Sequence, residues 1–197
     1  MPRTAGSSTA DQPRFYFSLA DPASYLWAER VNDVLPEVPE WIPVALWEPP
    51  AFRCAEERKA FEEDAGRAAR TLGLPPLVWP GAWPEADGLF ALRAATYAKS
   101  IGRAVAFSLA AFRQAFAAGR RLDDPDTVLI AAAALELRPR ALLKGAATEG
   151  TRRALAEATD RARAAGVRST PALVTAAGEV LTDLPAPPRP DGGPAAR

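Results

Sequence analysis

The chain has 197 residues and a mass of 21.0 kDa, which is the length of one domain. Its 24 Lys and Arg residues balance 24 Asp and Glu residues. Net charge therefore gives no reason to expect nucleic acid or an anionic membrane as the main partner. The chain has no histidine and one cysteine, Cys54. These counts exclude a His-based triad, a His-containing zinc site, an internal disulfide and a CxxC redox pair, and we expect no metal cofactor.

The two ends of the chain differ in composition from its middle. Residues 1–14 are small and polar and lack the apolar stretch of a signal peptide, so we expect a flexible N-terminus. No run of about 18 apolar residues predicts a transmembrane helix. Together with the lone thiol, this predicts a cytoplasmic protein. Residues 185–197 are rich in Pro and Gly and predict a disordered tail.

The first structured segment has the pattern strand, helix, strand. Residues 15–19 (FYFSL) form an apolar run typical of a buried strand. Asp21 is a good helix N-cap and Pro22 suits the first helical position, so we expect a helix with apolar positions up to Leu35. Residues 41–46 (WIPVAL) predict a second strand, whose internal proline favours a sheet edge or a bulge. Two strands joined by a helix favour a parallel βαβ unit.

The rest of the chain is mainly helical and ends in a hairpin. Alanine-rich segments with apolar residues three or four apart predict amphipathic helices. A tight turn at Ala177–Gly178 separates the last two extended segments. The expected elements are a helix at 52–72, a helical block at 85–143, a helix at 151–165, an extended segment at 167–175 and a strand at 179–182.

Four groups of residues, taken together and in order, resemble one family. They are Phe15–Phe17 followed by Asp21–Leu26, Leu72–Pro75 with Trp83–Pro84, Ala111–Phe116 with Asp123–Pro125, and Gly166–Ala172. This series resembles the DsbA-like branch of the thioredoxin superfamily, nearest to the group of 2-hydroxychromene-2-carboxylate isomerases and kappa-class glutathione transferases. The first motif is similar to that group's helix start S-P-Y-S-Y-L, and the last is similar to its segment G-V-x-G-V-P-T, which carries a cis-proline.

The resemblance implies an α/β thioredoxin-like fold over residues 15–184, with a helical insertion at about 85–150. It also implies that the family's last helix is lost, because the chain turns into the proline-rich tail there. A homodimer is the assembly that the resemblance implies.

The residue that opens the first helix departs from the family pattern. A Ser stands there in the isomerase and transferase group and helps to hold the glutathione sulfur, whereas redox members have a Cys. Here the position is Asp21. An ionised carboxylate cannot donate a hydrogen bond to a thiolate, and repels it by on the order of 1 kcal/mol at 4 Å in water. Asp21 is therefore interpreted either as a helix N-cap or as a catalytic general base with a raised pKa.

Five further residues are candidates for the same site. Ser24 is either a first-turn hydroxyl without a role or a donor to a ligand. By the resemblance, Pro171 is a cis-proline, and Thr170 before it offers its backbone to an extended thiol peptide. Trp83 and Tyr97 either line a pocket for a flat apolar or aromatic substrate or pack in the core.

One basic cluster also has two interpretations. Arg152, Arg153, Arg161 and Arg163 lie on one expected helix, interleaved with acidic residues. The cluster is either an anion site or, as the charge pattern favours, a solvated face.

Two functions remain open from the sequence. The first is an isomerase-like or glutathione-transferase-like enzyme that acts on a small aromatic or thiol-conjugated substrate, with glutathione or another low-molecular-weight thiol, or without one. It predicts a ligand-sized cavity that reaches Asp21, Ser24 and Thr170. The second is a catalytically inactive binding protein, for which this region is filled by side chains or covered by a partner. A dithiol oxidoreductase is excluded because Cys54 has no second cysteine in the chain.

Overall fold

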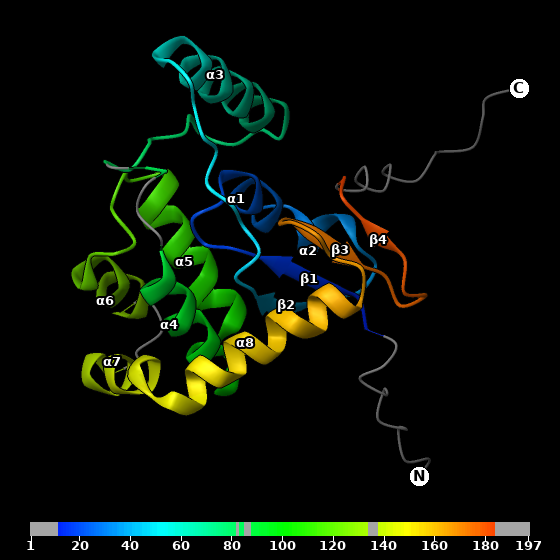
Figure 1. Ribbon diagram of the computed structural model, residues 1–197, viewed down its shortest axis with the longest axis vertical. Coiled ribbons are helices and arrows are strands. Elements are labelled where there is room, and N and C mark those ends of the chain that lie inside the picture. Colours follow the sequence, from blue (N-terminus) through cyan, green and yellow to red (C-terminus); the bar gives the residue numbers. More distant parts are fainter. Residues whose placement is uncertain (1–11, 82, 85–87, 134–137, 184–197) are drawn as a thin grey trace, which may run out of the picture.

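The structure is a computed structural model that describes residues 12–81, 83–84, 88–133 and 138–183. The expected N-terminal segment before residue 12, the expected tail and the expected loss of a last helix lie outside these ranges. Figure 1 shows a small sheet with helices on both faces. No helix among the described residues is long and apolar enough to cross a membrane.

The sheet has four strands in the order β2-β1-β3-β4. They are β1 (Arg14–Phe17), β2 (Glu40–Pro43), β3 (Ala172–Val174) and β4 (Val180–Leu181). Strands β1 and β2 are parallel, which confirms the predicted βαβ unit, and β3 is antiparallel to both of its neighbours. Pro43 ends the edge strand β2, where the missing N–H of a proline costs no hydrogen bond within the sheet.

Successive side chains along each strand point to opposite faces of the sheet, so the buried residues form two cores, one on each face. Phe15, Phe17 and Trp41 point into the larger core, which includes residues of α1 (Pro22–Ala28) and α5 (Ala104–Phe116). Tyr16 and Ile42 point to the other face and pack with buried alanines of α8 (Glu149–Ala164). Figure 1 shows α8 crossing the sheet on that side.

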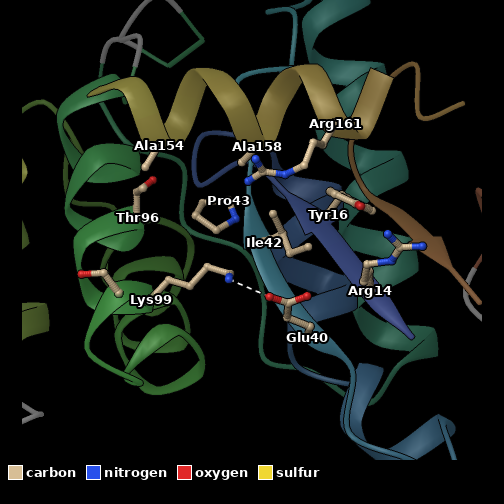
Figure 2. Close-up of a pocket in the computed structure, with 11 residues that line it drawn as sticks. Arg14, Tyr16, Glu40, Ile42, Pro43, Thr96, Lys99, Ala154, Ala158 and Arg161 are labelled. Atoms are coloured by element: carbon tan, nitrogen blue, oxygen red, sulfur yellow. Dashed lines mark hydrogen bonds and ion pairs between the residues drawn. The ribbon is translucent and has the colours of Figure 1, made fainter. Parts of the chain in front are cut away.

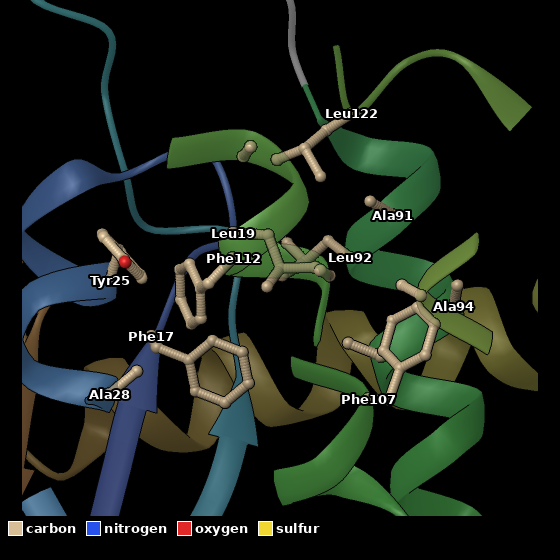
Figure 3. Packing of buried hydrophobic residues seen from close by; sticks show 14 of the residues in the cluster. Phe17, Leu19, Tyr25, Ala28, Ala91, Leu92, Ala94, Phe107, Phe112 and Leu122 are labelled. Atoms are coloured by element: carbon tan, nitrogen blue, oxygen red, sulfur yellow. The ribbon is translucent and has the colours of Figure 1, made fainter. Parts of the chain in front are cut away.

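The larger core is closely packed around aromatic rings. Figure 3 shows Phe17, Tyr25 and Phe112 together, with Leu19 and Leu92 beside them. The ring centroids of Phe17 and Phe112 are 5.7 Å apart, and those of Tyr25 and Phe112 are 6.1 Å apart. This packing fixes α1 against α5 and so positions the start of α1.

The remaining helices are α2 (Val31–Val34), α3 (Ala55–Thr71), α4 (Leu89–Ser100), α6 (Pro125–Ala133) and α7 (Pro139–Ala147). Helices α4 to α7 pack on one another beside the sheet, within the expected insertion. Helix α3 precedes them and lies at the top of the view in Figure 1, in contact with α1.

The helix expected up to Leu35 is divided into α1 and α2, which differs from the prediction. The break lies at Arg30, whose φ of −129° leaves the helical region. Its guanidinium donates to the carbonyl oxygen of Leu72, with Nε at 2.9 Å from that oxygen. Just before it, Glu29 accepts two 2.7 Å hydrogen bonds from Arg113. These contacts to distant segments turn the chain, and no local pattern indicates them.

Candidate functional site

Asp21 lies at the start of α1 and caps that helix with its own side chain. One carboxylate oxygen, Oδ1, accepts a hydrogen bond from the backbone N–H of Ala23 at 3.0 Å. The other, Oδ2, accepts from the Ser24 hydroxyl at 2.6 Å, a length typical of a charge-assisted O–H···O⁻ bond. The Ser24 hydroxyl in turn accepts from the N–H of Ser18 at 3.3 Å.

A third donor reaches Asp21 from the far end of the chain. Thr170 lies just before β3, and its hydroxyl donates to Oδ2 of Asp21 at 3.0 Å. The peptide bond between Thr170 and Pro171 is cis, as the resemblance implied. The structure therefore brings Asp21, Ser24 and Thr170 into direct contact and places Pro171 beside them.

This group of three side chains is buried. The exposed fraction is 3% for Asp21, 0% for Ser24 and 9% for Thr170. Burial raises the pKa of Asp21 from 3.8 to about 6, although the hydrogen bonds from Ser24, Thr170 and the backbone oppose this shift. At neutral pH the site thus holds a buried carboxylate whose charge is compensated by hydrogen bonds.

Trp83 covers the segment that leads into the site. Its indole N–H donates to the carbonyl oxygen of Ala20 at 3.0 Å, and the side chain is buried. The ring centroid of Trp79 lies 4.5 Å away, and that of Phe61 lies 5.6 Å away. Trp83 therefore contacts Ala20, the residue before Asp21, but its ring is surrounded by other aromatic side chains.

Tyr97 occupies a different part of the molecule. It lies on α4, where a Cβ built at Gly145 of α7 would come within 2.3 Å of its ring carbon Cε2. The Tyr97 ring therefore packs directly on the α7 backbone, between two helices of the insertion.

The sequence did not predict a cavity at the opposite end of β1. It is lined by charged residues that include Arg14, Glu40, Lys99 and Arg161 (Figure 2). The only signal in the two strands was a charged residue at the start of each, Arg14 in β1 and Glu40 in β2. Of these four residues, only Arg161 belonged to a predicted cluster. No group of three or more His, Cys, Asp or Glu side chains within the described ranges is arranged to hold a metal ion.

A comparison with models of protein families identifies the family. The DSBA-like thioredoxin domain matches residues 14–188, and the chain belongs to this family. No curated protein sequence matches the chain.

Solved structures with the same architecture include an isomerase and two redox proteins. A 2-hydroxychromene-2-carboxylate isomerase has a TM-score of 0.75 at 18% identity, over 86% of this chain and 87% of the other. A probable DsbA oxidoreductase from Streptomyces coelicolor has a TM-score of 0.67 at 19% identity, over 86% and 82%. The cytosolic disulfide reductase DsbM from Pseudomonas aeruginosa has a TM-score of 0.61 at 14% identity, over 86% and 87%. At these identities the likeness establishes the DsbA-like thioredoxin fold predicted from the sequence.

Proposed function

We propose that this chain is a thioredoxin-fold binding protein without thiol chemistry at the start of its first helix. The observation that carries the proposal is the burial of Asp21, whose two carboxylate oxygens are already bonded to the chain's own donors. In this fold the N–H groups at the start of the helix stabilise an anion, usually a thiolate. Here the chain supplies that anion itself.

A thiol has two obstacles at this position. The Asp21 carboxylate occupies the Ala23 N–H and the Ser24 hydroxyl, so these donors are not free for a sulfur. Its negative charge also repels a thiolate, by about 4 kcal/mol at 4 Å if the effective dielectric constant is 20. The tight burial of Ser24 leaves a ligand no direct access to the hydroxyl. A site filled by the chain's own side chains supports the binding proposal.

The segment before the cis-proline supports a binding role. Arg168 and Ser169 are exposed, and their backbone groups make no hydrogen bond to another described residue. Such a segment can pair with an extended peptide by strand addition. Because the Thr170 hydroxyl is held by Asp21, the segment is fixed at its end without a bound ligand.

Thermal unfolding with glutathione tests the proposal. A ligand at a hundred times its Kd stabilises a protein by about 2.7 kcal/mol. We expect no shift for the wild type and a shift for Asp21→Ser, which restores a hydroxyl donor. Asp126→Ser removes an equal charge from the exposed first turn of α6 and is the control. A shift in the wild type that is lost in Thr170→Val would overturn the proposal.

A thiol-independent isomerase is the second candidate, and the pKa of Asp21 favours it. A carboxylate with a pKa of about 6 is suited to proton transfer near neutral pH. The similar isomerase suggests 2-hydroxychromene-2-carboxylate as the probe. The binding proposal predicts no turnover above the uncatalysed rate in buffer without protein. Turnover that rises with an apparent pKa near 6 and is absent in folded Asp21→Asn would establish this candidate instead.

A further inference from the structure

A cavity of about 270 Å³ lies between the sheet, α4 and α8. It is on the side of the sheet opposite to the aromatic core. Arg14 and Glu40, the first residues of β1 and β2, lie at its edge, whereas Asp21 follows the far end of β1. The inference drawn from it is independent of the proposed function.

The register of β1 and β2 explains why polar side chains meet here. Arg14 pairs with Glu40, and Tyr16 pairs with Ile42, so the four side chains share one face of the sheet. Figure 2 shows Arg161 reaching from α8 over this face, with Tyr16 between it and Arg14. Two strands and a distant helix thus bring their side chains to one cavity.

The charges around the cavity are unbalanced. Three cations and one carboxylate line it, and Nζ of Lys99 lies 2.7 Å from Oε1 of Glu40, so those two charges compensate each other. Arg161 has only a 3.7 Å contact with Glu157 at the exposed rim. Arg14 forms no ion pair with any carboxylate in the described part of the chain. Two guanidinium groups therefore remain available to an anion.

The walls between these charges are suited to a small apolar group. Ile42, Pro43, Ala154 and Ala158 line the cavity, with the ring of Tyr16. Burial raises the pKa of the Tyr16 hydroxyl above its ordinary value, so the group stays neutral and can donate a hydrogen bond at neutral pH. A cavity of roughly 150 Å³ is large enough for benzene, so this one has room for a ring with a polar substituent.

We infer that this cavity binds a small organic carboxylate, whose carboxylate group is held by Arg161 and whose apolar body lies against Ile42 and the alanines of α8. Arginine suits this role because its planar guanidinium can donate two parallel hydrogen bonds to a carboxylate. The Lys99–Glu40 pair lies at the edge of the cavity, where Glu40 is the strand neighbour of Arg14.

Calorimetric titration of the full chain with benzoate tests the site, and benzamide is the neutral probe of the same shape. We expect saturable binding of benzoate and at least about fivefold weaker binding of benzamide, because a hydrogen bond to a charged group is the stronger one. No saturable benzoate binding, or equal binding of the two probes, would overturn the inference.

Two arginines on α8 provide a matched pair of variants. Arg161 and Arg153 each lie 3.7 Å from Glu157, and their side chains are 70% and 72% exposed, but only Arg161 lines the cavity. We expect Arg161→Gln to weaken benzoate binding about fivefold and Arg153→Gln to change it less than twofold. Equal effects would mean that benzoate senses only the overall charge of the helix.

Two alanines on the same helix test the position of the ligand. Ala154 lines the cavity and Ala156 does not, and both are exposed, so a large side chain is tolerated at each. We expect Ala154→Trp to abolish benzoate binding and Ala156→Trp to retain it, with unchanged melting curves without ligand. Retention of binding in Ala154→Trp would place the ligand elsewhere and contradict the inference.

Discussion

Two polar regions lie at opposite ends of β1, namely the start of α1 and the cavity under α8. They differ in whether their charged side chains have partners within the chain. At the start of α1, a single buried carboxylate receives three hydrogen bonds from the chain itself. In the cavity, Arg14 has no carboxylate partner among the described residues, and Arg161 has only a long contact at the rim. The first region is complete without a ligand, whereas the second leaves positive charge for one.

The difference separates the place where the family resemblance puts the site from the place where cations lack a close carboxylate partner. The fold places an anion at the start of the first helix, but Asp21 fills that place.

Removal of Trp83 should have the largest effect on stability. Trp83→Ala deletes a buried indole from the aromatic cluster with Phe61 and Trp79, and we expect a loss of about 3–5 kcal/mol in the free energy of unfolding. Trp83→Phe keeps a six-membered ring but loses the hydrogen bond to Ala20 and part of the ring volume, at a cost of about 1–2 kcal/mol. Urea unfolding measures both variants. A loss below 1 kcal/mol for Trp83→Ala would show that Trp83 is not closely packed in the aromatic cluster.

The buried Asp21 should make stability depend on pH. Its pKa is raised from 3.8 to about 6 in the folded state, so between these values the folded chain binds more protons than the unfolded chain. The contribution of this group is therefore most favourable below pH 4 and falls as pH rises to 6. The total fall is about 3 kcal/mol.

The difference between wild type and Asp21→Asn isolates this contribution from the other carboxylates. Urea unfolding from pH 3 to 8 should give a wild-type curve that falls relative to the variant within the stated window. A difference that is constant with pH would mean that Asp21 is solvated.

Loss of the Thr170 hydroxyl should destabilise the chain by about 2 kcal/mol, because Thr170→Val removes a donor to a buried charge. We also expect it to raise the pKa of Asp21 further. A double-mutant cycle with Asp21→Ala, which removes both acceptor oxygens, measures the coupling. Additive effects of the two changes would show that the hydrogen bond between residues 21 and 170 contributes nothing.

Tyr97 lies in neither polar region. Substitutions at two glycines, Gly145 and Gly150, test whether its ring packs on α7. A Cβ at Gly145 meets the Tyr97 ring at 2.3 Å, so Gly145→Ala should destabilise by about 1 kcal/mol after its better helix propensity is included. The nearest atom to a Cβ at Gly150 is 3.9 Å away, so Gly150→Ala should be stabilising by about 0.5–1 kcal/mol. Thermal unfolding compares them. A stabilising Gly145→Ala would place Tyr97 away from α7 and return it to the candidates for a substrate pocket.

The smallest expected effect concerns the one carboxylate in the cavity. Glu40→Gln removes a negative charge and releases Lys99, so benzoate should bind about two- to threefold more tightly. The calorimetric titration described above measures this change. Weaker binding would mean that Glu40 holds Lys99 in the geometry that the ligand needs.

Features set by local chemistry were predictable from the sequence. Asp21 caps α1 directly before Pro22, and Gly166 and Gly178 adopt positive φ values of 89° and 84° where a helix end and a hairpin turn were expected. The contact between Ser24 and Asp21 is also local, because the two residues are three apart on the first turn. Thr170 was a candidate only through the resemblance, since 149 residues separate it from Asp21.

Features set by the packing of distant elements were not predictable. The cavity forms only once α8 lies over β1 and β2, and the sequence does not specify where that helix packs. The same applies to Tyr97, whose direction depends on which helix lies against α4. In both cases the residue types were visible in the sequence, but their neighbours were not.

The carboxylate of Asp21 is buried and fills the start of α1. A carbon-13 NMR titration of the Asp21 carboxyl, assigned by its absence in Asp21→Asn, tests this most directly. We expect a midpoint near pH 6. A midpoint at or below 4, the range of a solvated aspartate, would show that the carboxylate is open to water and does not fill the start of α1.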